Sequence, residues 1–140
     1  MFQLNIRFFI FGIGHADIVK RKLLNLNSFM TSEVSPFPEP IYIETVLKEW
    51  KLYLDLLPEK PVLRELHLGG GTPTFFESDN LNHLIKSILD SVVLHKDYEF
   101  SFEGHPNNTT REHLQALYDV GFRRVKWATD YWVGYGGDLP

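Results

Sequence analysis

Cysteine is absent from the 140 residues of this sequence. Its absence excludes disulfide bonds, a thiolate nucleophile, and any zinc ion or iron–sulfur cluster held by thiolates of this chain. Long apolar runs are also lacking. The stretch FFIFGIG at residues 8–14 is far shorter than the roughly 18 residues that a membrane-spanning helix needs. We therefore expect no membrane partner and a cytoplasmic location.

Strong charge of either sign is lacking as well. The formal net charge is only −4, and no long run of one sign interrupts the sequence. A nucleic-acid-binding surface needs clustered basic residues, so we predict no nucleic-acid partner. The length is typical of one domain that buries its own core.

Two segments have apolar residues at helical spacing. The first helix is predicted over 43–57, between two prolines that limit it, and the second over 81–93. Ser78 or Asp79 is the expected N-cap of the second helix.

A third helix is predicted over 110–120. Thr109 and Glu112 match the spacing of a capping box at its start, and Gly121 supplies a left-handed stop at its end.

Short segments between these helices have the character of strands. In YEFSFE at 98–103, aromatic and polar residues alternate strictly, which is typical of a β-strand whose two faces differ. One face carries Tyr98, Phe100 and Phe102, and the other carries Glu99, Ser101 and Glu103. The alternation of strands with helices predicts an α/β fold with parallel strands, namely a partial (β/α) barrel of about three β/α units.

The polar face of YEFSFE has two interpretations. It lines the interior of an open barrel where a polar ligand binds, or it belongs to an edge strand that faces water. For domain organisation we expect an irregular segment at 1–39, the partial barrel at 40–128 and a tail at 129–140. Within the first of these, residues 1–13 could form a strand.

The sequence LHLGGGTPTFF at 66–76 joins a predicted strand to a predicted helix through three glycines. Glycines there let backbone N–H groups approach a ligand closely, and the helix N-terminus favours an anionic or polar small molecule. Neither a phosphate-binding loop nor a dinucleotide fingerprint fits the spacing. The alternative is a tight structural turn, with Thr-Pro-Thr fixing the exit into the helix.

His67, His105 and His113 do not predict a metal site. They lie far apart in the sequence, and no acidic residue recurs at ligand spacing, so ordinary polar roles are favoured.

Three motifs in order, GGGTPT, a strand ending in Glu with a nearby Pro, and GFRR before the next strand, resemble the oxygen-independent coproporphyrinogen III oxidases. This family belongs to the radical S-adenosylmethionine superfamily. Its enzymes oxidatively decarboxylate coproporphyrinogen III to protoporphyrinogen IX in haem biosynthesis. The resemblance covers residues 40–125 and implies S-adenosylmethionine as the small-molecule cofactor.

The resemblance also implies which residues bind the cofactor. In the family, the glycine loop receives the amino group and carboxylate of S-adenosylmethionine, and the strand-end glutamate contacts the cofactor. Matched by motif, the cofactor-binding residues are Gly70, Gly71, Thr72 and Glu103. Ligand sites of parallel α/β folds lie at the carboxyl ends of strands, which agrees with these positions.

The chain departs from the family pattern at both ends. The family holds a [4Fe-4S] cluster with a C-x-x-x-C-x-x-C segment, and alignment of QLNIRFF with the preceding strand puts Phe9, Ile13 and Ala16 at the cysteine positions. The cluster therefore cannot be ligated by this chain, and we assign no metal or catalytic residues. Later barrel sequence is also missing, as frameshift or truncation of a gene would produce.

The sequence thus predicts a truncated or degenerate relative that is catalytically inactive, or a non-enzymatic remnant or interaction module. A partial barrel leaves a sheet edge uncovered, which favours self-association.

Overall fold

The computed structural model describes residues 3–9, 25–27, 39–69, 73–127 and 136–138. Its strands form a six-stranded sheet in the order β2-β1-β3-β4-β5-β6. The strands are β1 (Gln3–Phe9), β2 (Asn25–Asn27), β3 (Val62–Gly69), β4 (Val93–Gly104), β5 (Arg124–Trp127) and β6 (Gly136–Asp138).

Neighbouring strands from β2 to β5 run parallel, which confirms the predicted α/β fold with a parallel sheet. The pairing of β6 with β5 is antiparallel, so the sheet departs from the expected all-parallel arrangement at this edge. The self-association expected from an uncovered sheet edge stays a prediction.

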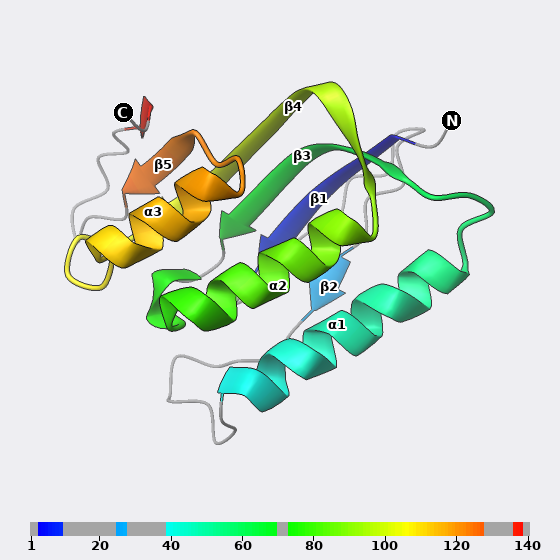
Figure 1. The fold of residues 1–140 in the computed structure, drawn as a ribbon, viewed down its shortest axis with the longest axis horizontal. Helices are drawn as coiled ribbons and strands as arrows, with labels where there is room; N and C mark the ends of the chain where they lie inside the picture. Colours follow the sequence, from blue (N-terminus) through cyan, green and yellow to red (C-terminus); the bar gives the residue numbers. More distant parts are fainter. Residues whose placement is uncertain (1–2, 10–24, 28–38, 70–72, 128–135, 139–140) are drawn as a thin grey trace.

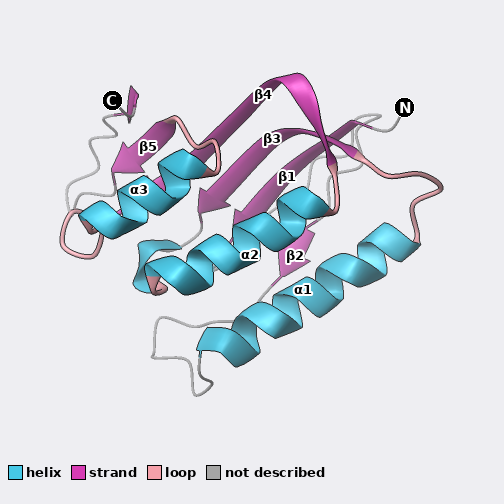
Figure 2. Ribbon diagram, in the orientation of Figure 1, coloured by secondary structure: helices cyan, strands magenta, loops and turns pink. Residues whose placement is uncertain are grey.

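Three helices cover one face of the sheet, as Figures 1 and 2 show. They are α1 (Glu39–Asp55), α2 (Ser78–Asp90) and α3 (Arg111–Asp119), and a short 3-10 helix (Pro73–Phe75) precedes α2. The helices predicted from apolar spacing are therefore confirmed, with ends shifted by a few residues. Among the described residues, no helix is both long enough and apolar enough to span a membrane.

The hydrophobic core lies between the helices and the sheet. Phe100 and Phe102 of β4 are almost completely buried and pack against the ring of Phe122, at centroid distances of 5.4 and 6.0 Å. Leu66 and Leu68 of β3 are buried beside them in the same cluster. The aromatic side of YEFSFE is thus the side under the helices, although Tyr98, nearer the start of the strand, remains 39% exposed.

The N-terminus of α2 differs from the prediction of Ser78 or Asp79 as its cap. Glu77 is the N-cap residue, and its side chain makes no capping hydrogen bond. Instead, Glu39 of α1 accepts hydrogen bonds from the Glu77 backbone N–H at 3.0 Å and from Asn80 Nδ2 at 2.8 Å. A carboxylate from another helix therefore binds the start of α2, where a local side chain was expected to act as the cap.

The capping box of α3 is one residue later than predicted. Thr110, rather than Thr109, is the N-cap, and His113, rather than Glu112, completes the box from the third helical position. Thr109 has another partner, because its hydroxyl lies 2.8 Å from the hydroxyl of Thr74. The predicted stop at Gly121 is confirmed by its φ of +106°.

Strands β1 and β2 lie inside the segment 1–39 that was expected to be irregular. The expectation of irregular structure is wrong for β1, which pairs with β3 from Gln3↔Val62 to Phe9↔Gly69. The sequence had allowed a strand at this place. Strand β2 extends the sheet beyond β1. The division into segments at residues 39 and 128 stays a prediction.

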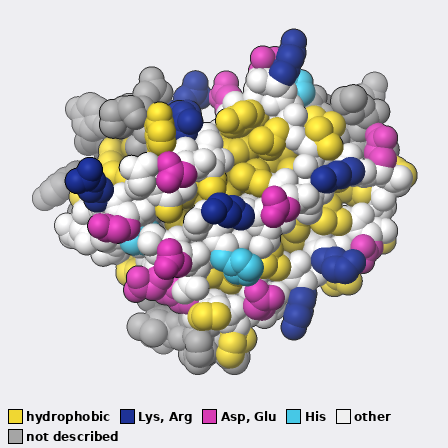
Figure 3. Space-filling model, viewed as in Figure 1, with side chains coloured by type: hydrophobic (Ala, Val, Ile, Leu, Met, Phe, Trp, Pro, Cys, Tyr) yellow, Lys and Arg dark blue, Asp and Glu magenta, His cyan; other side chains and the backbone are white. Residues whose placement is uncertain are grey.

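The helical face of the molecule carries charges of both signs. Figure 3 shows basic and acidic side chains interspersed over this face, with hydrophobic side chains between them. No single-sign patch dominates the described part of this view. The exposed apolar side chains of the α1 region include Ile41, Leu52 and Leu56.

Candidate functional site

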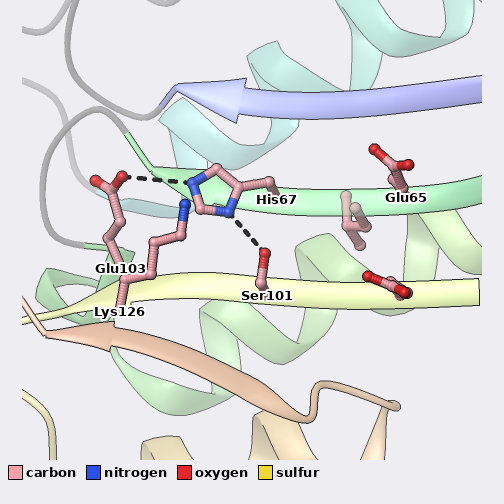
Figure 4. Close-up of a pocket in the computed structure, with 7 residues that line it drawn as sticks. Glu65, His67, Ser101, Glu103 and Lys126 are labelled. Atoms are coloured by element: carbon pink, nitrogen blue, oxygen red, sulfur yellow. Dashed lines mark hydrogen bonds and ion pairs between the residues drawn. The ribbon is translucent and has the colours of Figure 1, made fainter. Parts of the chain in front are cut away.

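The candidate site is a cavity of about 280 Å³ on the polar face of the sheet. It opens on the side of the sheet opposite the helices, near the ends of three neighbouring strands (Figure 4). Its lining consists of Glu65, Leu66, His67, Glu99, Ser101, Glu103 and Lys126. Ligand sites in parallel α/β folds occur at these carboxyl ends, where backbone groups and side chains of several strands converge.

Alternation along β3 and β4 explains why polar side chains gather there. On β4, Phe100 and Phe102 turn into the core, so Ser101 and Glu103 turn the other way. On β3, Leu66 and Leu68 are buried, and His67 faces the cavity. The polar face of YEFSFE thus lines a cavity rather than a plain water-facing edge.

His67 connects the two strands across the cavity. Its Nδ1 lies 2.8 Å from Ser101 Oγ, and its Nε2 lies 3.4 Å from Glu103 Oε1. Only 14% of the His67 side chain is exposed, against 35% for Glu103. The imidazole is thus held by Ser101 on one side and lies beside the Glu103 carboxylate on the other, which links β3 to β4 across the cavity.

Gly69, the last residue of β3, is in close contact with this pair. A Cβ added at Gly69 would lie 2.8 Å from His67 Nε2 and 2.9 Å from Glu103 Cδ. Such distances are too short for any side chain to fit without movement. The absence of a side chain therefore lets the Glu103 carboxylate lie directly against the backbone where the glycine run begins.

The segment after the glycines is fastened to the start of α3. Thr74 is buried, and its hydroxyl lies 2.8 Å from that of Thr109. His113 Nε2 lies 2.7 Å from the Phe76 carbonyl oxygen. These contacts hold the exit of the loop to the neighbouring β4–α3 connection, consistent with the expected role of Thr-Pro-Thr.

The predicted cofactor-binding residues fall into two groups. Glu103 lines the cavity, as a binding role requires. Gly70, Gly71 and Thr72 lie outside the described residues, so their assignment stays a prediction. Of the three histidines, His113 is buried and caps α3, whereas His67 faces the cavity.

Three polar residues of the cavity lie outside the polar face of YEFSFE and were not singled out as ligand-binding from the sequence, namely Glu65, His67 and Lys126. For the first two, the alternation in ELHL was the available signal, because Glu65 and His67 interleave with buried leucines. Lys126 follows the same rule on β5, where Val125 is buried. Its position opposite Glu103 depends on strand register, which the sequence does not reveal.

The residues present do not fit an iron–sulfur cluster. Such clusters are held by thiolates, and this sequence contains no cysteine. Within the part of the chain that the structure describes, no group of three His, Asp or Glu side chains is arranged to hold a metal ion. S-Adenosylmethionine is a different case, because Gly69 and Glu103 offer backbone access and a carboxylate at one point.

Comparison with known proteins bears on the predicted resemblance. Over 87 residues, 37% are identical to the oxygen-independent coproporphyrinogen III oxidase of Helicobacter pylori, covering 61% of this chain and 19% of that protein. The enzyme of the same name from a Synechocystis species is 29% identical over 101 residues, covering 72% of this chain and 21% of that protein. The chain is homologous to an internal segment of the oxygen-independent coproporphyrinogen III oxidases.

Related proteins extend beyond these oxidases. The heme chaperone HemW of Haemophilus influenzae is 26% identical over 97 residues, covering 67% of this chain and 25% of that protein. No family model matches the chain. The chain thus spans about a fifth to a quarter of the length of these curated relatives.

A solved structure agrees with the fold. Coproporphyrinogen III oxidase (HemN) from Escherichia coli, a radical SAM enzyme, superposes with a TM-score of 0.64 at 19% identity. The match covers 94% of this chain and 28% of the Escherichia coli oxidase. The sheet and helices described above are therefore arranged as in part of that enzyme.

Proposed function

We propose that this chain is a relative of the oxygen-independent coproporphyrinogen III oxidases that retains part of an S-adenosylmethionine site. The observation that carries the proposal is the contact between Gly69 and Glu103. The missing side chain at Gly69 leaves the backbone open at the end of β3, and the Glu103 carboxylate lies against it. This arrangement suits the ammonium group of a methionyl moiety, which needs an anionic acceptor near accessible backbone groups.

Each residue has a definite role in this proposal. Glu103 accepts hydrogen bonds from the ammonium group of S-adenosylmethionine, and His67 positions the Glu103 carboxylate. By the family resemblance, Gly70, Gly71 and Thr72 receive the same end of the cofactor. S-Adenosylmethionine supplies radical chemistry only in company with a reducing cluster, and this chain holds no thiolates for one. We therefore propose that the chain binds the cofactor without cleaving it.

The alternative function is a non-enzymatic interaction module in which the glycine loop is only a turn. The contacts Thr74–Thr109 and His113–Phe76 favour this alternative, because they fasten the loop exit without any ligand. They do not account for the carboxylate that lies against Gly69, and the first proposal does.

Calorimetric titration with S-adenosylmethionine distinguishes the two. We expect the unmodified protein to bind, and Glu103→Gln to bind roughly tenfold or more weakly, because a charge-assisted hydrogen bond contributes about 1.5–3 kcal/mol. Glu77→Gln is the matched control, since it neutralises an exposed glutamate at the start of α2. Its affinity should equal that of the unmodified protein.

Two results would contradict the proposal. One is the absence of binding by a protein whose circular dichroism shows the expected fold. The other is equal affinity of the unmodified and Glu103→Gln proteins. Anaerobic treatment with iron and sulfide addresses catalysis separately, because visible absorbance of a bound cluster would refute the claim that this chain holds none.

A further inference from the structure

Three polar side chains of the cavity form a connected row, as Figure 4 shows. Ser101 Oγ lies 2.8 Å from His67 Nδ1, and Glu103 Oε1 lies 3.4 Å from His67 Nε2. A hydroxyl, an imidazole and a carboxylate in this order are the parts of a Ser-His-acid triad, which is recognised by geometry and roles rather than by sequence order. All three side chains line the cavity, so a small molecule can reach them.

The contacts of His67 indicate which ring nitrogen carries the proton. An ionised carboxylate only accepts hydrogen bonds, so the contact with Glu103 places the proton on Nε2. A neutral imidazole then has its lone pair on Nδ1, which accepts the hydrogen bond that Ser101 Oγ donates. An imidazole in this state can take the proton of the hydroxyl. The longer contact, at 3.4 Å, is of the kind that tightens when a substrate binds.

Ser101 is placed on a rigid element and remains accessible. Phe100 and Phe102 on either side of it are buried in the core, so the pleat of β4 turns Ser101 toward the cavity. The Ser101 residue is only half-buried, whereas the His67 side chain is 14% exposed. The reacting hydroxyl thus meets the cavity, and the base behind it is held in place.

Lys126 supplies a positive charge near Ser101. It lies on β5 two residues after Arg124, and Arg124 pairs with Ser101 across the two strands. The spacing of strands and residues puts the backbones of Ser101 and Lys126 roughly 8 Å apart, a gap that a long lysine side chain can bridge. Figure 4 shows Lys126 extending from β5 toward His67. An ammonium at this position can stabilise the oxyanion that forms when a hydroxyl attacks a carbonyl group.

The other charges of the cavity limit the substrates that fit. Glu65 and Glu99 are paired in the register of β3 and β4, and both line the cavity. Arg124 donates to Glu99 at 2.9 Å and offsets one of these charges, so the Glu65 carboxylate still repels an anionic acyl group. The volume of about 280 Å³ is small for a ligand site. The cavity therefore suits short carboxylic esters without negative charge.

We propose that this cavity hydrolyses short, uncharged carboxylic esters, with Ser101 as the nucleophile and His67 as the general base. Ser101 Oγ attacks the carbonyl carbon, and its proton passes to His67 Nδ1. The bond to the alcohol oxygen then breaks, the alcohol leaves with that proton, and an acyl-serine remains. A water molecule gives a proton to His67 and attacks the acyl-serine. The carboxylic acid leaves, and the proton returns to Ser101 Oγ.

Glu103 is a positioning residue in this reaction. It holds the ring of His67 and stabilises the imidazolium that forms when the ring takes a proton. The reaction needs neither S-adenosylmethionine nor a cluster. It therefore goes beyond the proposed function.

The test uses 4-nitrophenyl acetate as the ester and a fluorophosphonate as a probe that bonds covalently to an activated serine. We expect the unmodified protein to release nitrophenol over many turnovers, and peptide mass mapping to place one probe adduct on Ser101. Ser101→Ala, which removes a single oxygen, should lose both signals. His67→Gln should slow both by at least about a hundredfold, the lower limit of general base catalysis.

Two further variants assign the supporting roles. Glu103→Gln should lower kcat at least about tenfold and leave KM unchanged, because Glu103 acts through the imidazole. A change confined to KM would contradict the positioning role. Lys126→Gln should lower kcat/KM roughly tenfold, the value of one charge-assisted hydrogen bond to the oxyanion.

Ser87→Ala and His83→Gln are the matched controls. Both residues are exposed on α2, which covers the other face of the sheet, and both variants should behave as the unmodified protein does. Circular dichroism verifies that each variant is folded.

Three results would overturn the proposal. They are a folded protein without a probe adduct on Ser101, equal rates in His67→Gln and the unmodified protein, and release of nitrophenol that stops after one equivalent. None of them bears on the binding of S-adenosylmethionine, which calorimetry measures separately.

Discussion

Substitution of Gly69 by alanine should damage ligand binding far more than folding. The new methyl group would lie 2.8 Å from His67 Nε2, 2.9 Å from Glu103 Cδ and 3.0 Å from Glu103 Oε1. The end of the Glu103 side chain is flexible and can move away, whereas the His67 ring is held by Ser101 at 2.8 Å. Overpacking of a rigid site lowers the free energy of unfolding by about 1–3 kcal/mol. Because one of the two neighbours can move, we expect Gly69→Ala to lower it by only about 1 kcal/mol.

Binding should respond differently, because the movement that relieves the overlap displaces the carboxylate proposed to receive the ammonium group. Loss of one charge-assisted hydrogen bond corresponds to roughly a tenfold weaker affinity for S-adenosylmethionine. Urea denaturation measures the free energy of unfolding, and calorimetry measures the affinity, on the same preparation.

Gly121→Ala is the matched control for this prediction. Gly121 has a φ of +106°, which side chains rarely adopt, and it lies on the turn between α3 and β5 rather than in the cavity. Strain of this kind costs about 1–3 kcal/mol, so Gly121→Ala should lose stability and keep its affinity when folded. The reasoning is refuted if Gly69→Ala binds S-adenosylmethionine as tightly as the unmodified protein does.

Two further predictions concern the scaffold. Phe122 is fully buried against Phe100 and Phe102. Phe122→Ala should therefore lower the free energy of unfolding, measured by urea denaturation, by about 3–5 kcal/mol. A decrease below about 1 kcal/mol would contradict the packing of this core. The hydrogen bond with the Thr110 side chain holds the pKa of the Glu112 carboxyl below its ordinary value of 4.5. A carboxyl whose pKa is lower in the folded protein stabilises the fold at any pH above its pKa in the unfolded chain. This contribution is lost as the pH falls through its pKa in the folded protein. Unfolding midpoints measured from pH 6 to about pH 3 should therefore fall less steeply in Glu112→Gln than in the unmodified protein, and parallel curves would count against this hydrogen bond.

Much of the fold could be predicted because its signals are local. The apolar spacing of 81–93 and the strict alternation of YEFSFE each reflect burial of one face, so the sequence alone located α2 and the end of β4. Strand β1 was harder, because a strand inside a parallel sheet needs no alternation. Strands β2 and β6 have three residues each, too few for any period.

The caps show where local patterns stop being sufficient. Thr109 and Thr110 are equally suitable as N-caps by type, and the choice depends on Thr74, which draws the Thr109 hydroxyl into a contact of 2.8 Å. At α2, the acceptor for the Glu77 N–H is Glu39, 38 residues earlier. Both outcomes depend on tertiary contacts that no short stretch of sequence encodes.

The candidate site shows the same division. The position of Glu103 on the polar face followed from alternation, and its link to a cofactor followed from the order of three motifs. The contact between Glu103 and His67 depends on the register between β3 and β4, and the position of Lys126 opposite Glu103 depends on the register between β4 and β5. Register is fixed by the packing of whole strands, so these two residues became part of the site only in three dimensions.

The central claim is that the carboxyl ends of β3, β4 and β5 form a site for S-adenosylmethionine. An NMR titration of the ¹⁵N-labelled protein with this ligand tests the claim most directly, because it reports the location of binding as well as its occurrence. We predict saturable shifts of the amide signals of Gly69, Ser101, Glu103 and Lys126, with the exposed residues of α1 and α2 unchanged. Shifts confined to the helical face, or none at saturating ligand, would contradict the account.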